Sequence, residues 1–83
     1  MRPDLFTLFG IFGAGCFICA YFAALQGLVA PSNWRFPALN LAGALLVLVS
    51  LYDAWNLPSV ILEAFWGAMS LYGLIRNLRR AAV

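Results

Sequence analysis

The sequence contains no histidine and few charges, which make up 10% of its 83 residues. Without histidine the chain lacks the commonest metal ligand, the commonest general base and the imidazole that ligates haem or chlorophyll magnesium. One acid inside an apolar run, with no base, metal or nucleophile beside it, forms no recognisable active site. We therefore expect no enzyme activity, no cofactor and no metal site.

Cysteine is also scarce, since Cys16 and Cys19 are the two cysteines of the chain. Their spacing is formally that of a C-x-x-C motif. Both lie near the middle of an apolar run, where no flanking base would form a thiolate. Two ligands are also too few for zinc. We interpret both as small packing residues, with redox chemistry as the alternative.

Apolar residues dominate what is present, because 65% of the chain is hydrophobic and its mean hydropathy is +0.93. A soluble domain is usually about 45–50% apolar and about 25% charged. A soluble chain of this length could not hide so much apolar surface, since small domains bury only about 60% of the surface that the unfolded chain exposes. The composition predicts a single all-α membrane unit over residues 1–83.

Three apolar runs are candidates for membrane-spanning helices, each of which needs about 20 residues. Residues 31–37, with two prolines, separate the first two runs, and the short connection 53–58 separates the second from the third. Such a short connection makes the chain reverse direction, so the last two runs form a helical hairpin. The predicted transmembrane helices cover about residues 5–30, 36–53 and 58–78.

The start of the chain has an alternative interpretation as a secretory signal peptide, with small residues near 20–24. Asp4 in the would-be basic region argues against it. The apolar run is also about twice the usual length of a signal peptide's apolar segment. We therefore expect an uncleaved first span.

All five basic residues are arginines at the edges of the apolar runs, a pattern that orients membrane spans and does not bind nucleic acid. With three spans, four arginines share one side, and Arg2 lies opposite with Asp4 and Asp53. The positive-inside rule then puts the N-terminus outside and the C-terminus in the cytoplasm of a bacterial inner membrane. The four arginines of the cytoplasmic side are Arg35, Arg76, Arg79 and Arg80.

Three of these arginines, Arg76, Arg79 and Arg80, stand three and four residues apart on one helical face. Just inside the membrane, such a face would engage anionic lipid headgroups. The simpler interpretation is an anchor that fixes the topology of the third span.

Small residues recur along the spans at spacings that let helix backbones approach closely. Gly10 and Ala14 form such a pair in the first span, and Gly43 and Gly67 are small positions in the second and third spans. These four are the predicted helix-packing residues. Packing within one subunit and a seam between two subunits both fit the pattern.

Glu63 lies inside the third apolar run, where hydrocarbon offers an acid no partner. Such a group must be paired, protonated or facing a water-filled cavity. Glu63, Gly67, Ser70 and Asn77 recur at steps of four, three and seven, so they share one packing face. A structural hydrogen bond, or an acid that reaches interfacial water, are the alternatives to a polar pathway.

The second span has a similar polar face, formed by Asn40, Gly43 and Ser50. Trp66 lies one turn from Glu63 and would line the same cavity or face lipid. The predicted solute or ion pathway therefore consists of Glu63, Asn40, Ser50, Ser70 and Trp66.

Parts of the sequence resemble a family of short uncharacterised bacterial inner-membrane proteins, sometimes described as transporter components. The resemblance rests on LNLAGALLVLVSL at 39–51, NLPSVILEAFW at 56–66 and SLYGLIR at 70–76, about half of the chain. It implies no established activity. It implies a family pattern that includes Asn40, Gly43, Pro58, Glu63, Trp66, Ser70 and Gly73.

The chain is also similar, more weakly, to the SemiSWEET sugar half-transporters. The likeness lies in the length, the three spans, the outside N-terminus and the Leu57-Pro58 pair followed five residues later by a polar residue. That residue is Glu63 here and asparagine in those proteins, and Phe22-Ala23-Ala24 stands where their first span has a Pro-Gln pair. This resemblance implies that a three-helix unit is half of a pore.

Three short helices cannot both enclose a polar path and shield it from lipid, so an acid on a packing face points to an oligomer. We expect a small homo-oligomeric membrane protein, first of all a parallel homodimer, that acts as a half-transporter or channel-like unit for a small polar or cationic solute. The alternative is a non-catalytic accessory subunit of a larger inner-membrane complex, whose small-residue faces pack against partner helices.

Overall fold

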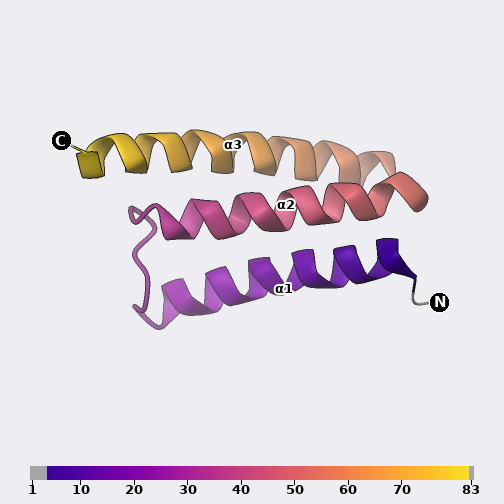
Figure 1. The fold of residues 1–83 in the computed structure, drawn as a ribbon, viewed down its shortest axis with the longest axis horizontal. Helices are drawn as coiled ribbons and strands as arrows, with labels where there is room; N and C mark the ends of the chain where they lie inside the picture. The colour runs from indigo at the N-terminus through magenta and orange to yellow at the C-terminus, as the bar shows by residue number, and fades with distance from the viewer. Residues whose placement is uncertain (1–3, 83) are drawn as a thin grey trace.

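The computed structural model describes residues 4–82, which form three helices, so that Arg2 lies outside the described residues (Figure 1). The helices are α1 (Leu5–Leu25), α2 (Arg35–Asp53) and α3 (Leu57–Ala82). All three are long and apolar enough to cross a membrane. With its 21 residues, α1 is about 31 Å long, close to the roughly 30 Å of a bilayer's hydrocarbon core. The prediction of an all-helical chain with three such helices is confirmed.

Helix α1 ends at Leu25, earlier than the predicted end near residue 30. Gly27 has a φ of 73°, the left-handed conformation that glycine adopts without a steric penalty. The Leu28 N–H donates to the Ala23 carbonyl at 2.9 Å, and the Gly27 N–H to the Ala24 carbonyl at 3.2 Å. These two bonds form a Schellman motif, which satisfies the last carbonyls of the helix. The apolar run in the sequence is therefore longer than the helix that it forms.

Side-chain caps begin α1 and α3. The Thr7 N–H donates to Oδ1 of Asp4 at 2.8 Å, and the Ser59 N–H donates to Oδ1 of Asn56 at 3.0 Å. Each cap satisfies a backbone N–H that has no partner within the helix. Both α2 and α3 begin one residue before the predicted starts, and α3 continues four residues beyond its predicted end near 78.

Helix α2 lies in the middle of the fold, with α1 along one side and α3 along the other (Figure 1). Across the described residues, the backbones of α1 and α3 pack against α2 and not against each other. The molecule is accordingly elongated and flat, with extents of 46 × 23 × 18 Å. The N-terminus and the α2–α3 turn lie at one end, and the α1–α2 loop and the C-terminus lie at the other.

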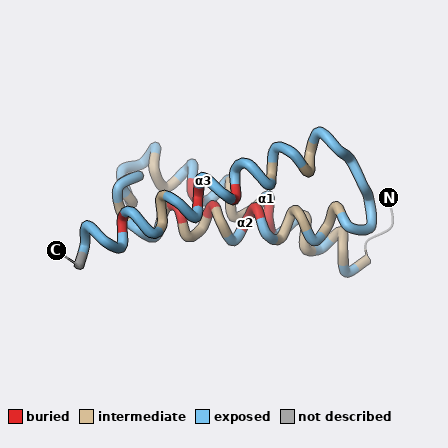
Figure 2. The backbone as a smooth tube through the Cα atoms, turned by 90° about the horizontal axis from the view of Figure 1, so that it is seen from above, coloured by how far each residue is buried: buried red, intermediate tan, exposed pale blue. Residues whose placement is uncertain are grey.

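The α1–α2 interface is closest where Gly13 meets Gly43. A Cβ on Gly13 would lie 2.8 Å from the Gly43 carbonyl oxygen, and a Cβ on Gly43 would lie 2.9 Å from the Gly13 carbonyl oxygen. Both distances are too short for a side chain, so this crossing requires glycine on each helix. Figure 2 shows the buried residues gathered in the central part of the molecule.

The predicted packing residues of α1 lie at different positions relative to α2. Gly13 rather than Ala14 faces Gly43, and Ala14 is exposed. Gly10 faces α2, because a Cβ there would lie 2.6 Å from Oγ of Ser50. The four predicted packing residues therefore include three that lie against a neighbouring helix and one that does not.

Helix α3 buries the face that its polar and small residues predict, since its buried residues are Gly67, Ser70 and Asn77. A Cβ on Gly67 would lie 3.5 Å from the Cβ of Ala44, which is ordinary contact. Among the described residues, the buried hydrophobic side chains are those of Ala20 and Ala44, and many large apolar side chains are exposed. A surface of this kind suits a lipid environment or a protein partner within the membrane.

Candidate functional site: a groove lined by all three helices

A groove of about 520 Å³ lies between α1 and α3, with α2 beside both. Each helix contributes two residues one turn apart, and α3 adds Glu63. The groove forms because the backbones of the flanking helices pack only on α2 and leave space between the side chains of α1 and α3. Its lining is Phe17 and Tyr21 from α1, Phe36 and Asn40 from α2, and Leu62, Glu63 and Trp66 from α3.

Glu63 is the one charged residue of this lining and lies in the second turn of α3, about 9 Å along the helix from Leu57. Glu63 as a whole is half-buried. Its Oε1 atom is buried and accepts no hydrogen bond from any described residue. Hydrogen-bonding groups that are removed from water are normally paired. The acid therefore has a buried acceptor atom without a described hydrogen bond, in a residue that lines the groove.

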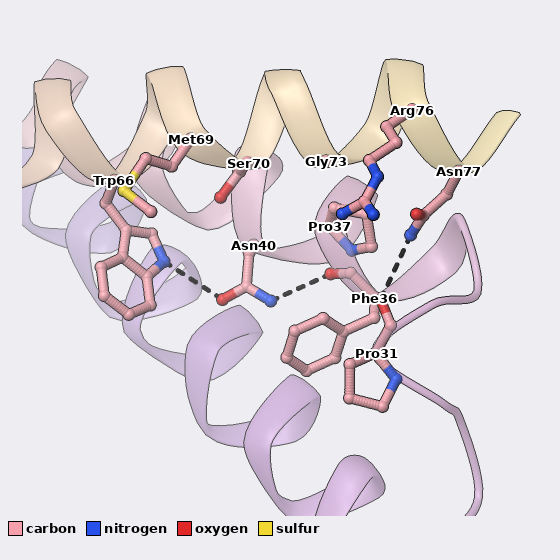
Figure 3. A pocket seen from close by; sticks show the side chains of 10 residues that line it. All are labelled: Pro31, Phe36, Pro37, Asn40, Trp66, Met69, Ser70, Gly73, Arg76 and Asn77. Atoms are coloured by element: carbon pink, nitrogen blue, oxygen red, sulfur yellow. Dashed lines mark hydrogen bonds between the residues drawn. The ribbon is translucent and has the colours of Figure 1, made fainter. Parts of the chain in front are cut away.

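Asn40 and Trp66 connect α2 to α3 beside the groove. Nε1 of Trp66 donates to Oδ1 of Asn40 at 3.2 Å, and Nδ2 of Asn40 donates to the Phe36 carbonyl at 2.9 Å (Figure 3). Asn40 is 7% exposed, so both of its polar atoms find partners inside the protein. These bonds hold the Trp66 ring in a defined position.

The aromatic rings of the groove also connect α1 to α3. The rings of Phe17 and Trp66 meet edge to face, with centroids 6.1 Å apart and an interplanar angle of 89°. Aromatic pairs prefer such an arrangement because the positive ring edge meets the negative ring face. Trp66 therefore contacts both other helices, through its N–H on one and its ring on the other.

A second, smaller cavity of about 250 Å³ lies between α2, α3 and the α1–α2 loop (Figure 3). Three residues line both spaces and lie between them: Phe36, Asn40 and Trp66. Other residues of the smaller cavity are Pro31, Pro37, Met69, Ser70, Gly73, Arg76 and Asn77.

Asn77 holds the α1–α2 loop against α3. Its Nδ2 donates to the carbonyl of Pro31 at 3.2 Å (Figure 3). It also donates to the carbonyl of Asn33 at 3.2 Å. Asn77 is 8% exposed. This contact places the loop, with Arg35 just beyond it, at the same end of the molecule as the arginines of α3.

The two ends of the molecule differ in charge. Arg35 lies over the Trp34 ring, with its guanidinium carbon 5.4 Å from the ring centroid. On α3, a shallow cavity of about 290 Å³ is lined by Tyr72, Ile75, Arg76, Arg79 and Arg80. Asp4 and Asp53 lie at the opposite end, beside the N-terminus and the α2–α3 turn. Among the described residues, four arginines therefore lie at one end and two acids at the other.

Four of the five predicted pathway residues lie together. Glu63 lines the groove, Ser70 lines the smaller cavity, and Asn40 and Trp66 line both. Ser50 lies elsewhere, on the α1–α2 interface next to Gly10.

The residues that the sequence analysis missed are the aromatic ones of the first two helices, Phe17, Tyr21 and Phe36. Phe17 and Tyr21 are four residues apart on α1, a spacing that places both on one helical face. That spacing could have indicated a shared site, but many lipid-facing pairs in the same helix have the same spacing.

Comparison with known proteins identifies a family but assigns no activity to it. The sequence profile of an uncharacterised protein family matches residues 6–81, which cover nearly all of the three helices. The match does not bear on the resemblance to transporter components or to the SemiSWEET proteins. No curated protein and no solved structure matches the chain.

Proposed function

The chain belongs to this uncharacterised family, and we propose that it is an integral protein of the bacterial inner membrane that binds a small polar or cationic solute at Glu63. In this proposal the chain is not an enzyme and performs no chemical step. The observation that carries the proposal is the buried, unpartnered Oε1 of Glu63 at the wall of a groove lined by all three helices.

An acid at this depth destabilises a membrane protein unless it has a partner, so acids inside membrane spans commonly mark solute, ion or proton pathways. A solute that donates a hydrogen bond or carries a positive charge would satisfy the free oxygen of Glu63. The same solute would lie against Trp66 and Asn40, which share the lining.

A second copy of the chain would complete the pathway. The groove lies between two helices whose backbones do not pack against each other, and one chain leaves it partly open. Two grooves that face each other across a two-fold axis would close the space and shield it from lipid. We therefore propose a homodimer in which each chain is half of a transporter or channel-like unit.

The charge difference between the ends supports an orientation. Positive charge in short loops and tails is retained on the cytoplasmic side of a membrane. Arg35 and the arginines of α3 lie at one end, together with the C-terminus. We therefore propose that the C-terminus is cytoplasmic, the N-terminus is outside, and the arginine-lined cavity of α3 contacts anionic headgroups.

A second candidate function is an accessory subunit of a larger membrane complex. The observation that favours it is an outward-facing set of small residues on α1, because Ala14 and Cys19 are exposed and a Cβ on Gly15 would meet nothing within 4 Å. Small surface residues let a partner helix approach closely. Purification in mild detergent separates the candidates: a defined dimer supports the half-transporter, and stoichiometric recovery with larger subunits supports the accessory role.

Solute flux tests the first candidate. Wild-type protein in liposomes is expected to take up radiolabelled methylammonium, and Glu63→Gln is expected to reduce the uptake to that of empty liposomes. Ser50→Ala is the matched control, because Ser50 lies on the α1–α2 interface and outside the groove. Equal uptake by the wild type and Glu63→Gln would contradict the role of Glu63.

A further inference from the structure

The groove combines one carboxyl group with an unusual number of aromatic rings. Four of its seven lining residues are aromatic, and all three helices contribute at least one of them. Besides Glu63, Asn40 is the other polar side chain of the lining that is not aromatic. The aromatic residues are Phe17, Tyr21, Phe36 and Trp66.

Aromatic rings attract cations through the negative potential of the ring face, and the attraction is strongest where water is excluded. A carboxylate beside several rings therefore favours a positively charged group whose substituents are themselves apolar. The ring contact between Phe17 and Trp66 and the hydrogen bond from Trp66 to Asn40 restrict the movement of these rings before anything binds. Restricted rings lower the entropic cost of binding.

The polar atoms of the groove suit a metal cation poorly. Calcium takes about six to eight oxygen ligands, and magnesium requires a near-octahedral set. The groove provides the Glu63 carboxyl group and the Asn40 amide, and Asn40 already accepts from Trp66 and donates to Phe36. An organic cation needs fewer oxygen ligands, because most of its surface contacts rings.

The size of the groove is also suited to an organic molecule. Its volume of about 520 Å³ is within the range of about 300–1,000 Å³ that is typical of small-molecule sites. A lipid acyl chain would fill the apolar part but would leave the Glu63 oxygen without a partner. A cation with apolar substituents satisfies both parts of the lining.

We propose that the solute of this groove is an organic ammonium ion with apolar substituents. Its nitrogen lies next to the Glu63 carboxylate, and its substituents lie against Phe17, Tyr21 and Trp66. The inference rests on the proposed function, in which Glu63 marks the binding site, and it names the chemical class that binds there.

Binding of benzyltriethylammonium tests this class. Equilibrium dialysis of the radiolabelled cation against the full chain in lipid nanodiscs, with empty nanodiscs as the blank, gives the dissociation constant. We expect Glu63→Gln to weaken binding at least about 30-fold, and Tyr21→Leu to weaken it about 5- to 30-fold. Tyr72→Leu is the matched control, because Tyr72 is exposed on α3 and outside the groove, and its binding is expected to equal that of the wild type.

Competition separates the charge from the shape of the ligand. The neutral analogue benzyltriethylsilane is expected not to displace the cation, and neither is potassium at the same concentration. Displacement by the silane would show that the groove binds apolar bulk alone, which overturns the inference. If Glu63→Gln does not fold, judged by circular dichroism and size exclusion, Tyr21→Leu decides: weaker binding supports the inference, and unchanged binding overturns it.

The outcomes distinguish this inference from the proposed function. Glu63-dependent flux of methylammonium without binding of benzyltriethylammonium would retain the proposed function and overturn the ligand class. Binding of benzyltriethylammonium that depends on Glu63, without flux of methylammonium, would support the proposed ligand class and would contradict the proposed transport function.

Discussion

Nε1 of Trp66 donates a hydrogen bond to Oδ1 of Asn40 at 3.2 Å, which joins α3 to α2 at the wall between two cavities. The same asparagine donates to the Phe36 carbonyl one turn earlier in α2. Asn40 is thus fixed to its own helix and fixes the ring of Trp66 in turn. The position of the groove's largest ring therefore depends on this amide as well as on the contact with Phe17.

A double-mutant cycle tests this relationship. We expect Asn40→Ala and Trp66→Phe to be coupled by about 0.6–1.7 kcal/mol, the size of side-chain hydrogen bonds measured between membrane helices. The measurement is unfolding in detergent, followed by circular dichroism. Trp55→Phe is the control, because Trp55 is exposed near the α2–α3 turn, and its effect should add to that of Asn40→Ala. If the effects of Asn40→Ala and Trp66→Phe on the free energy of unfolding are additive, the hydrogen bond contributes nothing to stability.

Removal of the Asn77 amide should release the α1–α2 loop. Asn77→Ala deletes both hydrogen bonds to the loop carbonyls, and a lost hydrogen bond in a buried position costs about 1–3 kcal/mol. We expect chymotrypsin to cleave after Trp34 about tenfold faster or more, because cleavage of an opened segment follows its opening equilibrium. Leu78→Ala is the control next to it, exposed on the same helix. Equal cleavage of the two variants would show that Asn77 does not hold the loop.

The crossing of α1 and α2 should tolerate no side chain at Gly13. Gly13→Ala places a methyl group against the Gly43 carbonyl, and overpacking of this kind costs about 1–3 kcal/mol. Gly15→Ala should be neutral or stabilise the chain by up to about 1 kcal/mol, since alanine is the better helix former and a Cβ there meets nothing within 4 Å. Thermal unfolding in detergent compares the two. Similar stability of both variants would contradict the close approach of the helices.

The three helices follow from the sequence because length and apolarity alone determine which segments can cross a membrane. The buried face of α3 was also predictable, since Gly67, Ser70 and Asn77 keep one helical period. The end of α1 was not, because the run remains apolar through residue 30 while Gly27 turns the chain by its positive φ. Hydropathy carries no information on that turn.

The groove was predictable only in part. Glu63 stands out because an acid is costly inside an apolar run. Phe17, Tyr21 and Phe36 do not, since aromatic residues are common at membrane interfaces and on lipid-facing surfaces. They become a site only because α2 separates α1 from α3, and no local sequence pattern predicts that order of helices.

Cysteine labelling tests the proposed orientation. In a chain with Cys16→Ala and Cys19→Ala, we expect Ala54→Cys to react with a membrane-impermeant maleimide in intact spheroplasts, because the proposed orientation puts the α2–α3 turn outside. Ser32→Cys should react only after the membrane is opened, because the α1–α2 loop lies at the arginine end. The reverse pattern would invert the proposed topology.

Reaction of the chain with dicyclohexylcarbodiimide, an apolar reagent for carboxyl groups, tests the central claim that Glu63 presents a free carboxyl group to the groove. Mass mapping is simple because the chain has three acidic side chains, of which Glu63 alone lies in the interior of a predicted span, since Asp53 is the last residue of the second span and Asp4 precedes the first. We predict modification at Glu63 in the wild type, no such product in Glu63→Gln, and slower modification in the presence of benzyltriethylammonium. An unreactive Glu63, or a reaction rate that the cation does not change, would contradict the account.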